Sequence, residues 1–364
     1  MKKIMILANN DVGLYRFRRE LIEILLKQYE VHVVLPYGEF IDDFIEMGCY
    51  YHSVEFCRRG TNPIHDLKLL EKYKSLIRTI KPFAVLTYTI KPNIYGGMAC
   101  ATLGIPYITN ITGLGSAVES TGILSKITTT LYKYALRKSQ KVFFQNSANL
   151  AFMKSKNIVK ENYGLLPGSG VNLVEHCFHP YPQETDNLIF LFIGRVMKDK
   201  GIEELFEAAA RIKSEYKYVA FKIIGSYEDD YNETLTKLSE DGIVEFLGYQ
   251  NNVHSLIAQS HCTILPSYHE GTANVLLESA ACGRPIIATN VPGCRETFDE
   301  GISGFGCEVR NAESLYLKIK DFIELPHEKR EEMGKFGRLK MEREYDRQIV
   351  IDAYIKEINK ALSD

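Results

Sequence analysis

The fold is decided by the stretch Cys262-Thr-Ile-Leu-Pro266 together with Glu270-Gly-Thr-Ala-Asn-Val-Leu-Leu-Glu278. The first run predicts a short buried strand, and residues 273–282 predict a helix that Gly283 ends. A helix that follows a strand presents its free N–H groups at the rim of a parallel sheet. Glu270 is expected at this rim, and Glu278 about two turns into the helix. The pattern therefore predicts a site for a ligand with an anionic centre and hydroxyl-rich ends, which is the shape of a nucleotide-sugar.

The same alternation of apolar strands and amphipathic helices runs through both halves of the chain. Strands are expected at 4–8, 31–36, 51–56, 84–88, 107–111, 142–145, 188–193, 220–224, 244–247, 262–266 and 286–288. Helices are expected at 15–27, 64–80 and 202–213, and the chain beyond residue 312 reads as helical. This order predicts an α/β fold with parallel sheets that carry helices on both faces.

A length of 364 residues suits two domains rather than one. Residues 172–187 are rich in Pro, Glu, Asp and Asn and lack a periodic pattern, so they are interpreted as a linker. Doubly wound domains are therefore expected at 1–171 and 188–340, with a C-terminal helix at 341–364 that packs back toward the first domain. The carboxyl ends of both sheets are expected to face one cleft, which is where open sheets of this kind bind ligands.

The composition is that of a globular enzyme, with 45% apolar and 25% charged residues. The eight cysteines form no C-x-x-C pair and read as reduced thiols of a cytoplasmic protein. The basic start is followed by an apolar run of only strand length, and no run approaches the roughly 18 apolar residues of a spanning helix. Neither a signal peptide nor a membrane-spanning helix is predicted.

The net charge of −2 is the sum of a basic N-terminal half and an acidic C-terminal half. A basic half suits a phosphorylated acceptor or an anionic membrane surface, and an ordinary solvated face is the alternative. Residues 124–141 interleave lysines and arginines with apolar residues, which fits either a membrane-contacting helix or a core helix with a solvated side. A nucleic-acid partner is not predicted.

A second glycine-bearing turn carries two cations at the expected rim of the C-terminal sheet. Gly194-Arg195 and Lys200-Gly201 lie where the strand at 188–193 gives way to a helix. Arginine can fork two phosphate oxygens and lysine acts as a point charge. An ordinary basic turn is the alternative, but the Glu270–Glu278 unit in the same sheet favours a phosphate site.

No metal and no cofactor are predicted. Divalent metal at a diphosphate calls for closely spaced carboxylates, and the chain has no Asp-x-Asp. Since a helix N-terminus contributes only about 0.3–2 kcal/mol, Arg195 and Lys200 should neutralise most of the charge. His176 and His179 have metal-like spacing, but the sequence offers no third ligand near them, so they are interpreted as a surface pair.

In the first domain three strand exits offer candidate contacts. Gly13, in the turn after the first strand, would bring backbone N–H groups against a leaving diphosphate, although a plain turn fits equally well. The absence of G-x-G-x-x-G around it counts against an NAD enzyme. Candidate acceptor contacts are Lys91, Asn93 and the glycine loop Gly113-Leu114-Gly115.

Together these motifs resemble the retaining glycosyltransferases of family four, which have the GT-B fold of two Rossmann-like domains. The motifs that carry the resemblance are Gly194-Arg195, Lys200-Gly201, Pro266–Gly271, the E-x7-E spacing to Glu278, Ala281–Pro285 and Gly293–Glu296. The resemblance implies that the first domain binds the acceptor and the second the donor. It implies that Glu270 contacts the donor sugar, Glu278 the ribose, and Arg195 and Lys200 the diphosphate. The loop residues Gly271, Thr272, Ala273 and Asn274 would line the donor, and the turn at Tyr249 would hold the base through backbone atoms.

Within the family, Lys91-Pro92-Asn93 and Gly113–Gly115 resemble the bacterial branch that elongates undecaprenyl-diphosphate-linked glycans and capsular polysaccharides. Two departures stand out. Many members have Pro where this chain has Ala273, which leaves the donor sugar open. Many members also carry a His in the cleft of the first domain, and residues 87–91 contain none.

The expected activity is metal-independent, retaining transfer of a hexose or N-acetylhexosamine from a UDP-sugar to a lipid-diphosphate-linked sugar. Glu270, Arg195 and Lys200 are the expected catalytic residues. Two alternatives remain open: a GT-B sugar-nucleotide epimerase, and a non-catalytic nucleotide-sugar-binding subunit. The protein is expected in the cytoplasm, with contact at the inner face of the plasma membrane if the basic segment binds lipid.

Overall fold

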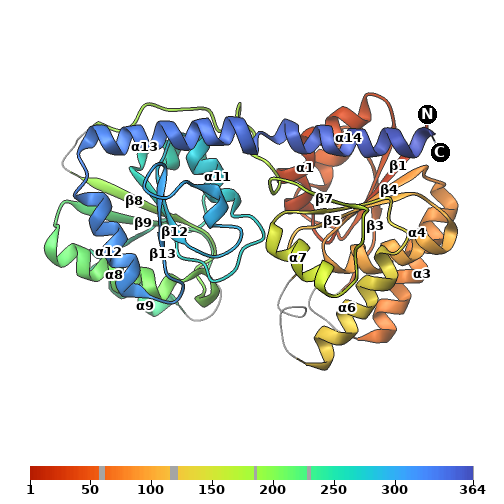
Figure 1. The fold of residues 1–364 in the computed structure, drawn as a ribbon, viewed down its shortest axis with the longest axis horizontal. Coiled ribbons are helices and arrows are strands. Elements are labelled where there is room, and N and C mark those ends of the chain that lie inside the picture. The colour runs from red at the N-terminus through yellow and green to blue at the C-terminus, as the bar shows by residue number, and fades with distance from the viewer. Residues whose placement is uncertain (57–61, 115–121, 184–186, 228–230, 364) are drawn as a thin grey trace. The chain divides into compact units, whose positions relative to one another are not determined.

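The computed structural model describes residues 1–56, 62–114, 122–183, 187–227 and 231–363, and divides into two compact units (Figure 1). The first unit comprises 1–169 and 348–364, and the second comprises 170–347. The boundary at Gly170 places residues 172–183, which the sequence suggested as part of a linker, within the second unit.

The first unit contains a seven-stranded parallel sheet in the order β3-β2-β1-β4-β5-β6-β7. Its strands are β1 (Lys3–Leu7), β2 (Glu30–Leu35), β3 (Tyr50–Ser53), β4 (Ala84–Tyr88), β5 (Tyr107–Ile111), β6 (Lys141–Phe144) and β7 (Tyr163–Leu165). Its helices are α1 (Asp11–Leu26), α2 (Ile41–Glu46), α3 (Pro63–Ile80), the π-helix η1 (Pro92–Gly96), α4 (Gly97–Leu103), α6 (Ile123–Leu136), α7 (Ser147–Ser155) and α14 (Arg347–Ser363).

The second unit contains a six-stranded parallel sheet in the order β10-β9-β8-β11-β12-β13. Its strands are β8 (Leu188–Ile193), β9 (Val219–Ile224), β10 (Glu245–Phe246), β11 (Cys262–Leu265), β12 (Ile286–Thr289) and β13 (Gly304–Cys307). Its helices are η2 (Lys198–Lys200), α8 (Ile202–Glu215), α9 (Asn232–Glu240), α10 (Val253–Gln259), α11 (Asn274–Ala281), η3 (Arg295–Thr297), α12 (Ala312–Ile323), α13 (His327–Lys340) and the π-helix η4 (Met341–Tyr345).

Alternating side chains of each central strand pack against different helices, as expected for a sheet covered on both faces. In β8, Phe190 and Phe192 join the large core that includes α8 and α12, whereas Leu191 packs with Ile257 of α10. In the first unit, Ile4 and Ile6 of β1 pack in the cluster formed with α1 and α14. The predicted α/β class with two parallel, doubly wound sheets is confirmed.

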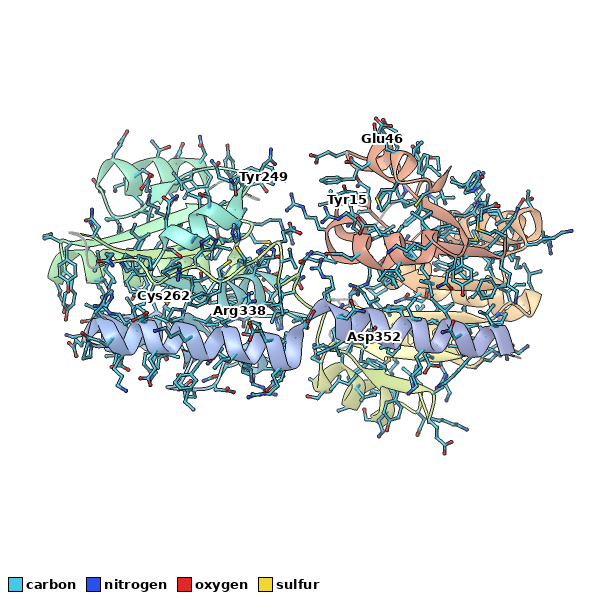
Figure 2. All side chains as sticks on the ribbon, turned by 90° about the horizontal axis from the view of Figure 1, so that it is seen from above. Tyr15, Glu46, Tyr249, Cys262, Arg338 and Asp352 are labelled. Atoms are coloured by element: carbon cyan, nitrogen blue, oxygen red, sulfur yellow. The ribbon has the colours of Figure 1, made fainter. Side chains whose placement is uncertain are left out.

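The C-terminal helical run serves both units in turn. Arg338 lies on α13 and Asp352 on α14 (Figure 2). Arg338 Nη1 donates to the backbone oxygens of His176 and Ala281, each at 3.0 Å, within the second unit. Further along, Tyr354 of α14 is fully buried in the core of the first unit.

Tyr354→Phe is expected to destabilise the first unit by about 1–3 kcal/mol. The Tyr354 hydroxyl accepts a 2.7 Å hydrogen bond from Asn110 Nδ2, and both residues are 0% exposed. Removing the acceptor leaves a buried amide N–H without a partner, which costs its desolvation energy. Urea unfolding measures the change, and Tyr134→Phe at a 58% exposed position should shift stability by less than about 0.5 kcal/mol. Equal midpoints for the two variants would refute this role.

Candidate functional site

The candidate site lies at the carboxyl edge of the second sheet, where β8 and β11 are neighbours. From β8 the chain winds outward through β9 and β10, and then returns to place β11 on the other side of β8. Open α/β sheets bind ligands at such a switch point, because the loops on either side diverge and leave a crevice. The loops that begin at Gly194 and Pro266 follow these two strands.

The loop after β8 is fixed by its neighbours. The Gly194 N–H donates to the Ile224 oxygen, and Val196 N–H donates to the Ser226 oxygen, each at 2.9 Å. Gly225, with φ of +144°, passes so close that a Cβ there would lie 1.9 Å from the Gly194 oxygen. The backbone beside Arg195 is therefore held by the loop after β9, while the Arg195 side chain is exposed.

The turn that carries Lys200 packs directly on the loop after β11. The 3₁₀ turn η2 ends at Gly201, whose φ is +69°. A Cβ on Gly201 would lie 2.0 Å from the Pro266 oxygen. In addition, the Tyr268 N–H donates to the Asp199 oxygen at 2.9 Å. Lys200 is thus delivered to the second loop by backbone contacts that do not depend on its own side chain.

Lys200 and Glu270 meet at this edge. Lys200 Nζ lies 2.5 Å from Glu270 Oε1, and the two side chains are 22% and 14% exposed. A partly buried pair of this kind is screened less by water and salt than a surface pair. The structure therefore brings together two residues that are 70 positions apart in the sequence.

A third loop, which follows β12, supports the backbone of Glu270. Gly293 has φ of +87°, and a Cβ there would lie 2.6 Å from the Glu270 oxygen. The Gly293 oxygen accepts from Ala273 N–H at 2.9 Å, and its N–H donates to Glu296 Oε2 at 2.7 Å. Ala273 precedes α11 and has no side-chain oxygen to cap it. The first N–H groups of α11 are therefore suited to an anion at this edge.

Two polar atoms near these loops lack partners among the described residues. Ser267 is 0% exposed and its Oγ has no hydrogen bond, although its backbone oxygen accepts from Thr289 Oγ1 at 2.5 Å. Asn274 Oδ1, at the start of α11, is also buried without a partner. Buried polar groups are nearly always paired, so unpaired ones beside a sheet edge mark a candidate ligand site. The sequence analysis did not assign Ser267 to the site. The signal that could have identified it is a serine next to Pro266 at the end of a strand.

Cys294 lies close to the same carboxylate. Burial first, and then the negative charge of Glu270, raise the pKa of the Cys294 thiol well above its usual value. Both effects favour the neutral thiol over the thiolate at this edge.

The remaining predicted donor residues lie on the same set of loops. Glu278 is partly buried on α11, and Gly271 and Thr272 are partly buried in the loop before it. Gly248, with φ of +65°, turns the chain after β10, and its oxygen accepts from Gly225 N–H at 2.9 Å. Tyr249 follows with 57% of its surface exposed, among the outer side chains of the second unit (Figure 2).

The candidate residues of the first unit have structural partners. The Gly13 N–H donates to Asn10 Oδ1 at 2.7 Å, as part of the cap of α1. Lys91 Nζ lies 2.6 Å from Asp66 Oδ1, and Asn93 is 1% exposed with its Nδ2 bonded to the Asn110 oxygen at 2.8 Å.

The glycine loop of the first unit is only partly described. Leu114 is buried and Gly113 partly buried, while Gly115 lies outside the described residues. Sequence reasoning missed Thr89, which directly follows β4 with φ of +70°. Since β1 and β4 are neighbours at the switch point of the first sheet, this strained residue marks a second candidate edge.

The interpretation of His176 and His179 as a bare surface pair needs a correction. His254 of α10 lies against both, with its Nε2 2.8 Å from His179 Nε2, and Cys177 lies beside them. No local sequence pattern indicates this contact, because His254 is 75 residues away from His179 and only the packing of α10 brings the two together.

Gly201→Ala is expected to destabilise the second unit by about 2–4 kcal/mol. The left-handed φ costs an alanine about 1 kcal/mol, and the contact with the Pro266 oxygen adds about 1–3 kcal/mol of overpacking. Gly242→Ala is the matched control, since its φ of +67° is nearly the same but nothing lies within 4 Å of its Cβ. Denaturant unfolding of both variants separates the two costs, and equal losses would refute the close packing of the two loops.

A helix able to span a membrane is not found in the described parts of the chain, where no helix is both long and apolar enough.

Two family models match the chain in consecutive regions. The Glycosyl transferase 4-like model matches residues 3–146, and the Glycosyl transferases group 1 model matches residues 178–340. The second match contains Arg195, Lys200, Glu270 and Glu278.

Similar proteins include two named glycosyltransferases and a protein solved with UDP and glucose. The N,N'-diacetylbacillosaminyl-diphospho-undecaprenol alpha-1,3-N-acetylgalactosaminyltransferase of Campylobacter jejuni is 25% identical, and the alignment covers 100% of both chains. The capsular polysaccharide biosynthesis glycosyltransferase CapM of Staphylococcus aureus is 26% identical over 89% of this chain and 88% of its own. The Anabaena protein Alr3699/HepE, solved with UDP and glucose, superposes with a TM-score of 0.80 at 17% identity, covering 99% of this chain and 100% of its own.

Proposed function

Because this chain belongs to the glycosyltransferases with the GT-B fold, we propose that it transfers a hexose or N-acetylhexosamine from a UDP-sugar to a lipid-diphosphate-linked sugar. The transfer would retain the configuration of the anomeric carbon and serve bacterial polysaccharide or glycan biosynthesis. The observation that carries the proposal is the contact of Lys200 with Glu270 at the switch point between β8 and β11. A cation suited to a diphosphate and a carboxylate suited to sugar hydroxyls are held side by side on loops fixed by backbone packing.

The donor would exchange the partners of this pair. Diphosphate oxygens would accept hydrogen bonds from Lys200 Nζ, from Arg195 and from the first N–H groups of α11. Sugar hydroxyls would donate hydrogen bonds to the Glu270 carboxylate. Glu278 would bind the ribose, and the turn at Tyr249 the base. Since backbone contacts hold the loops that carry both members of the pair, little rearrangement of the backbone is needed for binding.

In the reaction, the bond between the anomeric carbon and the diphosphate oxygen breaks, and a bond to the acceptor oxygen forms. The acceptor hydroxyl gives its proton to the departing phosphate. Negative charge grows on the diphosphate in the transition state, so Lys200 and Arg195 would stabilise the transition state more than the ground state. Glu270 would position the sugar ring rather than form a covalent bond to it.

The proposed transfer needs no divalent metal, because protein cations neutralise the diphosphate. Treatment with EDTA is therefore expected to leave the transfer rate within about twofold of the untreated rate. A loss of more than about tenfold that added Mg²⁺ restores would contradict this assignment.

The acceptor is proposed to be lipid-linked. The Campylobacter relative is named for an acceptor on diphospho-undecaprenol, and its alignment spans the full chain. In the first unit, α6 exposes Leu124, Ile127 and Tyr134 beside Lys126 and Lys133, a combination that suits an anionic membrane surface. Co-sedimentation with anionic but not zwitterionic vesicles would support this contact, and equal recovery with both would refute it.

The activity is tested by incubating the protein with a panel of UDP-sugars, with and without a lipid-diphosphate-linked sugar. Product that appears only with the acceptor, with the α or β configuration of the donor kept, supports the proposal. An epimerised UDP-sugar formed without acceptor would favour an epimerase, and binding without turnover would favour a non-catalytic subunit. Thermal shifts with the same panel identify the donor, because a ligand that prefers the folded state raises the apparent stability.

A further inference from the structure

A cluster of His and Cys side chains lies away from the transfer site, where the chain enters the second unit. It comprises Cys177 and His179 on the segment before β8, His254 on α10, and the nearby His176 and Cys282. All of these residues belong to the second unit. Neither the sheet-edge site nor the proposed transfer uses any of them.

Three of the five side chains present a triangle of ligand atoms. His179 Nε2 and His254 Nε2 are 2.8 Å apart, and Cys177 Sγ lies 3.5 Å and 3.9 Å from them. A point equidistant from three atoms with these separations lies about 2.0 Å from each, close to the zinc–nitrogen bond length of about 2.0–2.1 Å and the zinc–sulfur length of about 2.3 Å. Small adjustments of the side chains would give tetrahedral angles.

We propose that Cys177, His179 and His254 bind a zinc ion, with water in the fourth position. Two imidazole nitrogens and a thiolate are ligands that suit Zn²⁺ in proteins. Cys177 is exposed and the histidines are partly buried, so an ion can enter from solvent. Because the ion would bind to thiolate and neutral imidazole, binding releases the thiol proton.

The backbone that carries the ligands is held in place by Arg284, which is fully buried. On one side its guanidinium donates to the His179 oxygen at 3.2 Å and the Pro180 oxygen at 2.9 Å. On the other side it donates to the Ile257 oxygen at 3.2 Å and the Ala258 oxygen at 2.7 Å, both on α10. The two ligand-bearing segments are therefore joined without an ion, and the site is preorganised for one.

The other ring nitrogen of His254 also has a partner. Its Nδ1 lies 3.3 Å from Cys282 Sγ, and Cys282 is fully buried. This sulfur faces Nδ1, whereas the ligand triangle is built on Nε2 of the same ring. A contact on the far nitrogen fixes the orientation of a ligating imidazole, as partners of zinc-bound histidines commonly do.

The proposed ion would act as a structural tie. Helix α11 lies between the cluster and the transfer site. Cys282 follows the last residue of α11 and Glu270 lies before its first residue, so roughly 12 Å of helix separates the two. An ion on Cys177, His179 and His254 would fasten the segment that leads into β8 to α10. It would raise the stability of the second unit and leave the transfer chemistry to Lys200 and Glu270.

The test is calorimetric titration of the metal-stripped full chain with ZnCl₂, compared with a Cys177→Ser/His179→Asn double variant. The wild type is expected to bind one equivalent, with an affinity at least about a hundredfold higher than that of the double variant. His65→Asn, at an exposed histidine of the first unit, is the control and should bind as the wild type does. Equal affinities of the wild type and the double variant, or no binding to the wild type, would overturn the proposal.

A second measurement does not depend on the folding of any variant. CoCl₂ added to the metal-stripped wild type is expected to give the near-ultraviolet band of a cobalt–thiolate bond together with visible tetrahedral bands. A spectrum without the thiolate band would overturn the role of Cys177. Binding of UDP-sugar, measured in parallel, is expected to stay within about twofold with and without zinc, so a failure of the zinc site is distinguishable from a failure of the proposed transfer.

Discussion

Lys200→Ala is expected to lower the turnover number by about 10²–10³-fold, the usual loss when one preorganised group that stabilises developing charge is removed. The dissociation constant of the UDP-sugar should rise by less than about tenfold. Lys200 pairs with Glu270 at 2.5 Å, so donor binding would exchange one anionic partner of Lys200 for another and gain little affinity. Lys200 would stabilise the transition state instead, because negative charge grows on the diphosphate as it leaves the sugar.

Steady-state kinetics and calorimetry with the same donor measure the two effects separately. Lys198→Ala is the matched control, because Lys198 lies on the same turn but is 67% exposed and pairs only loosely with Glu203 at 3.6 Å. That variant should keep turnover within about twofold. Equal fold-losses of turnover and donor affinity in Lys200→Ala would mean that Lys200 supplies uniform binding, which contradicts the role proposed for it.

Glu270→Gln is expected to weaken UDP-sugar binding and lower kcat/KM by about 10–100-fold, while the affinity for UDP alone changes by less than about threefold. A carboxylate that accepts hydrogen bonds from sugar hydroxyls contributes about 1.5–3 kcal/mol, and a neutral amide loses most of this. UDP lacks the transferred hexose, so its affinity should not depend on the Glu270 carboxylate. The comparison of the two ligands is made by calorimetry on one protein preparation.

Glu207→Gln, at an exposed position of α8, controls for the loss of one charge from this unit. The two proposed roles of Glu270 are separated by mass spectrometry of the wild type incubated with donor alone. A positioning residue leaves the protein mass unchanged. A sugar attached to Glu270 would identify it as a covalent nucleophile and overturn the positioning role.

Much of the architecture was predictable because most strands are buried on both faces and so read as continuous apolar runs. The strands at 84–88, 107–111 and 188–193 have the observed bounds. The strands β7 and β13 were not predicted. Both are edge strands of three or four residues that contain glycine, which weakens the pattern that sequence reasoning depends on.

The sequence was sufficient to predict which residues form the candidate site, but not which contacts hold them in place. Lys200 and Glu270 were assigned to one ligand because each follows a strand of the same sheet, and the structure places them 2.5 Å apart. The contact of Gly293 with the Glu270 backbone and the burial of Ser267 were not predictable. Both depend on how separate loops cross, which no local sequence pattern encodes. For the same reason the sequence did not reveal the partners of Lys91 and Asn93, since Asp66 and Asn110 come from distant segments.

The most direct test of the account is the structure of the protein with a bound UDP-sugar. We expect the diphosphate to contact Lys200 and Arg195, the sugar hydroxyls to contact Glu270, and a ribose hydroxyl to contact Glu278. The donor should open the Lys200–Glu270 pair. A UDP-sugar bound elsewhere, with Lys200 Nζ and Glu270 Oε1 still paired and no ligand atom near them, would contradict it.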